Sequence, residues 1–151
     1  MTTQIEVKGL QPLIARMQKY PKELQKVMEI TTKAALLVFW ENVPPYPEKT
    51  ERGSYDRTGT LGRSLGVGEG GGKAGEPSIF TVKPIGTSGY EGKFGTNLGY
   101  APYVIGDGTQ AKVHQGRWWT MKTIAEKSAA KIAKVFNTAG EKLAAFLAGK
   151  E

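Results

Sequence analysis

The chain contains no cysteine and only one histidine, His114. The missing thiols exclude disulfides, thiolate zinc sites and cysteine nucleophiles, so packing alone must stabilise the fold. Long apolar runs are also missing, because the most apolar one, Ala34–Trp40, is far shorter than the roughly 20 residues of a membrane span. The N-terminus lacks the charged and apolar regions of a secretory signal. We therefore expect a cytoplasmic protein without a membrane segment.

Glycine and basic residues are present in excess. The 151 residues include 20 glycines, well above the usual share of about 7%. Lysine and arginine together number 21 against 14 acidic residues, which gives a net charge of +7. The length suits one domain spanning 1–151. The basic charge permits attraction to nucleic acid or to an acidic protein surface but specifies neither.

Helical periodicity dominates both ends of the chain. Apolar residues at i, i+3, i+4 and i+7 from Leu10 predict a short first helix, and Pro21 opens a longer one that reaches Asn42, so 10–42 is expected to be helical. After two tryptophans, the same periodicity runs almost to the C-terminus and predicts a helix over 119–148.

The middle of the chain favours loops and strands. Residues 43–60 are polar and rich in proline and glycine, which predicts an extended loop, with one helical turn following near Leu61. Residues 61–105 predict a small sheet with a glycine-rich hairpin tip at 68–77; its strands are "SIFTVKPIG", "YEGKFGTN" and an edge strand at "YAPYVI". The expected fold class is α+β, with an N-terminal helix pair and a long C-terminal helix packed on a mostly antiparallel sheet. Residues 48–56 and 68–76 are expected to be mobile in an isolated monomer.

Three motifs suggest an enzyme, and each lacks a part that the chemistry needs. Gly66, Gly68 and Gly71 match G-x-G-x-x-G, but no helix can open after them to receive a pyrophosphate. The sequence "GGK" departs from a P-loop, since Val67 and Ala74 replace the required glycine and hydroxyl residue. His114 has no partner set for general base catalysis or metal binding, which favours a structural histidine. We therefore assign no catalytic residue, cofactor or metal ligand, and expect a protein that is not an enzyme.

Basic residues near the C-terminus leave two interpretations open. Lys127, Lys131, Lys134 and Lys142 share one face of the predicted last helix, and Trp118 and Trp119 precede it. Lysines beside aromatic rings can hold phosphates and stack bases, which would make the chain a DNA-binding module. The alternative is a solvated lysine face, with the tryptophans anchoring the start of the helix in the core.

Two segments together resemble a known family. "VPPYP…YDRTGTLGRSL" is similar to a proline-containing exit from a long helix followed by T-G-x-L-x-x-S-[IL], and "GTNLGYAPYVIGDGTQAKVHQGRWW" is similar to G-T-x-x-x-Y-A-x-Y-V…G-T. Both elements occur in the neck and tail-completion proteins of long-tailed bacteriophages, which are minor tail or head–tail joining components. Two departures stand out: Gly62 replaces a basic or helix-favouring residue, and Ile105 replaces an acidic one in a run that is one residue longer.

The resemblance implies a structural virion protein of a phage or prophage, assembled in the host cytoplasm. Such a subunit forms a ring in the neck, which tail symmetry suggests is hexameric, and contacts other neck and tail proteins close to the packaged DNA. No small-molecule substrate is implied. The residues that match the family elements are fold or assembly positions: Thr58, Gly59, Leu61, Ser64, Leu65, Tyr100, Ala101, Tyr103, Val104, Gly108 and Thr109. To these we add the structural His114 and the expected helix anchor Arg117, Trp118 and Trp119.

Overall fold

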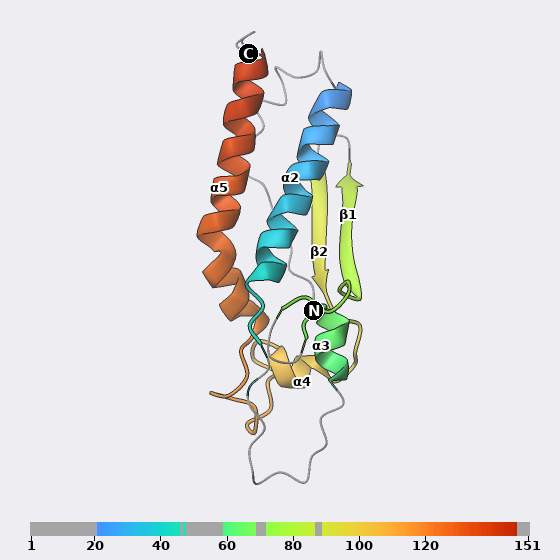
Figure 1. Cartoon of the computed structure of the whole chain (residues 1–151), viewed down its shortest axis with the longest axis vertical. Helices are drawn as coiled ribbons and strands as arrows, with labels where there is room; N and C mark the ends of the chain where they lie inside the picture. The colour runs from blue at the N-terminus through green and yellow to red at the C-terminus, as the bar shows by residue number, and fades with distance from the viewer. Residues whose placement is uncertain (1–20, 46, 48–58, 69–71, 87–88, 148–151) are drawn as a thin grey trace.

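A computed structural model describes residues 21–45, 47, 59–68, 72–86 and 89–147. Its elements are α2 (Pro21–Glu41), α3 (Thr60–Leu65), β1 (Ile79–Ile85), β2 (Gly89–Gly95), α4 (Ala101–Ile105) and α5 (Met121–Leu147). The two long helices lie side by side, with the β1–β2 hairpin against the other side of α2 and the two short helices grouped at one end of the molecule (Figure 1). The predicted α+β class is confirmed. The predicted first helix lies outside the described residues.

Helix α2 forms the centre of the packing. It confirms the long helix expected after Pro21. Leu36 and Phe39 are almost completely buried in the main core, while Leu24 contacts Leu143 of α5 in a smaller cluster farther along the helix pair. The buried hydroxyl of Thr32 donates to the Met28 carbonyl oxygen at 2.7 Å. That bond satisfies a polar group that burial would otherwise destabilise.

The hairpin packs on α2 through alternate residues. Strands β1 and β2 pair antiparallel, with Phe80 opposite Phe94 and Val82 opposite Gly92. A Cβ at Gly92 would lie 3.0 Å from the Thr32 methyl group, so the missing side chain permits the close approach of the strand to the helix. The rings of Phe94 and Phe39 lie 5.1 Å apart between their centroids. These contacts stabilise a two-stranded sheet that would be marginal alone.

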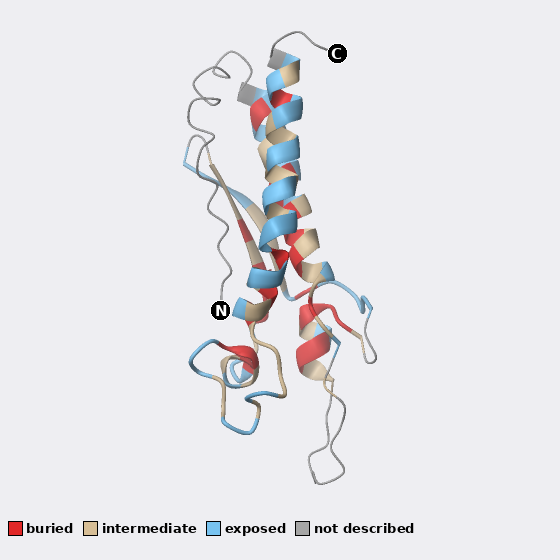
Figure 2. Cartoon of the chain, turned by 90° about the vertical axis from the view of Figure 1, so that its left-hand side faces the viewer, coloured by how far each residue is buried: buried red, intermediate tan, exposed pale blue. Residues whose placement is uncertain are grey.

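Helix α5 begins at a capped turn and buries one stripe. The Thr123 amide donates to the Thr120 hydroxyl oxygen at 3.3 Å, which satisfies one free amide of the first turn. Met121, Ile124 and Ser128 are buried toward α2. The face turned away from α2 consists largely of exposed residues (Figure 2). The predicted C-terminal helix is confirmed from Met121 to Leu147, and among the described helices none is long and apolar enough to cross a membrane.

The expected edge strand at Tyr100–Val104 is wrong, because Ala101–Ile105 forms the short helix α4. Pro102 occupies its first turn, where a missing amide costs nothing, and Ala101 and Ile105 are both buried at helical i, i+4 spacing. A run of six apolar and aromatic residues, Tyr100–Ile105, fits either period, so tertiary burial decides between them. The sheet predicted over 61–105 is therefore reduced, within the described residues, to β1 and β2.

The glycine-rich segment does not form the hairpin tip that we predicted. The hairpin connection of the sheet lies between Ile85 and Gly89, whereas Val67 and Lys73 form only an isolated antiparallel bridge. The residues before the glycines form helix α3 and its exit, so the glycine-rich segment pairs with them only at the Val67–Lys73 bridge. The loop predicted over 43–60 is described only in part, because 48–58 lies outside the described residues. Within that range, Val43–Pro45 are non-helical and Thr60 already belongs to α3.

Candidate assembly surface

Helix α3 is only six residues long, and a glycine flanks it at each end. Gly59 precedes it with a φ of 66°, and Gly66 follows it with a φ of 68°, both in the left-handed region that side-chain-bearing residues rarely adopt. The Val67 amide donates to the Gly62 carbonyl oxygen at 2.8 Å and the Gly66 amide to Arg63 at 3.1 Å, which is a Schellman termination. The left-handed backbone conformation of Gly59 therefore explains why the T-G-x-L element has a glycine at this position.

Gly66 connects three parts of the chain. Its carbonyl oxygen accepts a hydrogen bond from the Ala74 amide at 2.9 Å and another from the Trp40 indole at 3.3 Å. The amine of Lys73 lies 4.6 Å from the centroid of the Trp40 ring and 4.0 Å from a Glu41 carboxylate oxygen. The glycine-rich segment therefore folds back over α3 and the end of α2, a placement unlike that of a phosphate-binding loop.

Ser64 links α3 to both strands. Its hydroxyl donates to the Leu61 carbonyl oxygen at 2.6 Å and lies 2.8 Å from the Thr96 hydroxyl, while its own carbonyl oxygen accepts from the Ser78 amide at 2.7 Å. Because the single Ser64 proton goes to Leu61, Thr96 must be the donor in the hydroxyl pair. The serine of the T-G-x-L-x-x-S element therefore fixes α3 to the residues that flank the hairpin.

Side chains from the following segment satisfy the carbonyl groups at the end of α4. The Thr109 hydroxyl donates to the Pro102 carbonyl oxygen at 2.8 Å. The Gln110 amide donates to Val104 at 2.8 Å and also to the Trp118 carbonyl oxygen at 3.1 Å. Gln110 thus connects α4 to the entrance of α5. Sequence analysis did not predict this role, because an isolated glutamine in a loop has no local pattern that marks its long-range partners.

The segment before α5 packs on the core through its aromatic residues. Trp118 and Trp119 are half-buried against the main core, with ring centroids 6.2 Å apart. His114 meets Trp118 edge-on at 6.3 Å, and its carbonyl oxygen accepts from the Trp118 amide at 2.8 Å. Arg117 is half-buried in the same turn. This geometry anchors the start of α5. Among the described residues, no three His, Asp or Glu side chains are grouped to hold a metal ion.

The residues that match the family elements divide into two groups. One group builds the core at this end of the molecule: Leu61, Leu65 and Ala101 are buried, and Val104 packs against them. The other group is exposed, namely Tyr100, Tyr103, Gly108 and Thr109. Thr58 lies outside the described residues. Thr96 and Gln110 complete the arrangement and were missed by sequence reasoning.

Three large apolar side chains in α4 and the segments beside it are exposed. Tyr103 of α4 is 61% exposed, the neighbouring Tyr100 is 43% exposed, and Val113 in the segment after α4 is 70% exposed. Exposed apolar groups of this size are typical of protein contact surfaces when they share one region. We call the surface formed by Tyr100 and Tyr103 the α4 surface.

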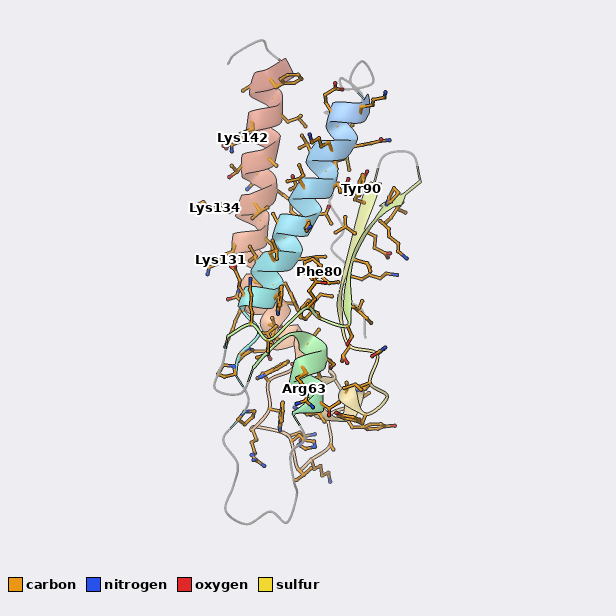
Figure 3. All side chains as sticks on the ribbon, turned by 45° about the vertical axis from the view of Figure 1, so that its right-hand side comes forward. Arg63, Phe80, Tyr90, Lys131, Lys134 and Lys142 are labelled. Carbon is orange, nitrogen blue, oxygen red and sulfur yellow. The ribbon has the colours of Figure 1, made fainter. Side chains whose placement is uncertain are left out.

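The four lysines of the alternative interpretation lie elsewhere. Lys127, Lys131, Lys134 and Lys142 are all exposed on α5. Figure 3 shows Lys131, Lys134 and Lys142 projecting from the side of α5 opposite α2. Trp118 and Trp119 are packed against the core, so their rings are not freely presented beside the lysines.

Compared with models of protein families, with curated proteins and with solved structures, the chain matches none.

Proposed function

We propose that this chain is a structural, non-enzymatic subunit of a tailed-phage or prophage virion, and that it completes the tail or joins it to the head. Copies form a ring, hexameric by the symmetry of such tails, that contacts other neck and tail proteins after assembly in the host cytoplasm. Support comes from the paired T-G-x-L and Y-A-x-Y-V elements within a helix, loop, sheet, helix order.

The observation that carries the proposal is the division of the family-matching residues. Leu61, Leu65 and Ala101 build a rigid end of the molecule, on which α4 presents Tyr100 and Tyr103 to solvent. A monomeric enzyme gains nothing from exposed tyrosines on a short, well-anchored helix. A subunit of a closed ring needs such a surface, because each copy contacts its neighbour through exposed apolar groups.

The test is complementation of a phage that lacks this gene. Wild-type protein should restore joined virions, whereas Tyr103→Asp should leave DNA-filled heads separate from tails, because a charge at the centre of the contact remains unpaired. Ile30→Asp is the matched control, since Ile30 is 57% exposed on α2, away from the α4 surface. Both variants are first shown to keep the wild-type circular dichroism and melting temperature. Joined virions without the gene would refute the virion function itself.

A further inference from the structure

Helix α5 carries a lysine stripe that the proposed ring contact does not use. We define the α5 lysine stripe as Lys127, Lys131, Lys134 and Lys142, which are all exposed. At about 100° per residue, the four side chains fall within roughly 80° of the helix surface, on a flank whose centre lies about 70° around the helix from that of the buried Met121, Ile124 and Ser128. Over 15 residues the stripe extends for about 22 Å along the helix.

These lysines have no acidic partners within the described part of the chain. The ion pairs found there join Lys73 to Glu41, Lys93 to Glu91 and Lys122 to Glu126. Glu126 is the acid nearest to the start of the stripe along the chain. It pairs instead with Lys122, at 3.9 Å, on another part of the α5 surface. Glu141 is the one acid beside the stripe, and it is exposed at its far end. The exposed lysines of α2 differ, because Glu23 and Glu29 lie among them.

We infer that the α5 lysine stripe binds the phosphate backbone of duplex DNA. Duplex DNA carries one negative charge for every 1.7 Å or so of its axis, so a straight row of amines about 22 Å long can contact several phosphates at once. The exposed residues between the lysines are alanine, asparagine and threonine, together with Glu141. We expect the contact to be independent of sequence, because phosphate contacts carry no sequence information directly. This inference stands apart from the ring proposal, since it needs only the isolated protein.

The experiment measures binding of a fluorescent 25-base-pair duplex of random sequence by anisotropy, from 50 to 200 mM NaCl. For three to four phosphate contacts the logarithm of the affinity should fall with the logarithm of salt with a slope of about −3 to −4. The variant Lys127→Gln/Lys131→Gln/Lys134→Gln should bind on the order of a hundredfold more weakly at 100 mM and lose most of that slope. Glutamine keeps a similar helix propensity, so α5 should remain intact.

The matched control is Lys22→Gln/Lys26→Gln/Lys33→Gln on α2, which removes the same charge from three exposed lysines of the other long helix. Near-wild-type binding by this control supports the stripe, whereas equal losses in both variants overturn it in favour of net charge alone. Absence of binding at 50 mM salt overturns it as well. Tighter binding to polyglutamate than to the duplex at equal charge would assign the stripe to an acidic protein surface instead.

Discussion

The hydroxyl oxygens of Ser64 and Thr96 lie 2.8 Å apart, and this bond fastens helix α3 to the end of strand β2. The Thr96 oxygen also accepts from the Leu98 amide at 3.2 Å, so the contact continues toward α4. The serine of one family-like element is thereby connected to the segment that leads into the other. The two elements, which are remote in sequence, are built as one unit.

Removing either hydroxyl of this pair should destabilise the protein. We expect Ser64→Ala to lower the free energy of unfolding by about 1 to 2 kcal/mol, because Thr96 keeps a buried hydroxyl without its acceptor. The pair energy comes from a double-mutant cycle with Thr96→Val, measured by urea unfolding. A coupling energy of about 1 kcal/mol supports the bond, and strictly additive losses would contradict it.

Gly66→Ala should strongly destabilise the protein. A Cβ there would lie 2.8 Å from the Trp40 ring and 2.9 Å from the Gly75 carbonyl oxygen, at a φ of 68°. We expect a loss of about 2 to 4 kcal/mol, combining the left-handed backbone with overpacking. Thermal unfolding followed by circular dichroism measures it.

Substitutions at two further glycines separate the cost of the left-handed backbone from the cost of overpacking. Gly72 has a φ of 86° but nothing within 4 Å of a Cβ, so Gly72→Ala should cost only about 1 to 2 kcal/mol. Gly99 has neither constraint, and Gly99→Ala should be nearly neutral. Equal effects at all three positions would show that contact with Trp40 is unimportant.

Ser128→Ala should leave stability unchanged or raise it slightly. The Ser128 hydroxyl is fully buried between α5 and α2, and its oxygen has no hydrogen-bond partner among the described residues. Alanine removes an unsatisfied polar atom and is the better helix former, so we expect a gain of up to about 1 kcal/mol. Urea unfolding measures the free energy of unfolding of this variant. Ser64→Ala, which removes a hydrogen-bonded hydroxyl, is the comparison. A loss above about 1 kcal/mol would indicate a partner for Ser128 in solution.

Gln110→Met should loosen the segment between α4 and α5. Methionine is close to glutamine in size but donates nothing to the Val104 and Trp118 carbonyl oxygens. We expect the amides of Ala111 and Trp118 to exchange hydrogen at least several-fold faster, because their bonds at 2.8 Å close this segment. Hydrogen exchange read by NMR or mass spectrometry measures it. Gln25→Met, at an exposed site on α2, is the control and should change nothing there.

Sequence periodicity predicted the long elements well. Helices α2 and α5 were expected close to their observed bounds, because each repeats its apolar pattern over enough residues to exclude the other period. The two strands were expected from their β-branched and aromatic residues. Helix α4 was misassigned since Tyr100–Ile105 is short and its Ala101 and Ile105 are buried by contacts from distant parts of the chain. The glycine-rich segment was misplaced for a similar reason, as its position depends on Trp40 and Gly66.

The candidate surface was predicted in part. The family-like elements contained Tyr100 and Tyr103, but their spacing could not tell exposed members from buried ones while the segment was taken for a strand. The contributions of Thr96 and Gln110 are hydrogen bonds to remote atoms, and no local pattern marks them.

The helical form of α4 also changes what a neighbouring molecule could use. A strand at Tyr100–Val104 would have offered its main-chain groups to any extended segment of similar length, with little regard for side chains. In α4 those groups are occupied, with the Tyr103 amide bonded to Tyr100 and the Gly106 amide to Pro102, both at 3.0 Å. Recognition here must depend on the shape and phenol groups of two tyrosine rings. Such a surface would discriminate between closely related partners, and one substitution in it could change which of them fits.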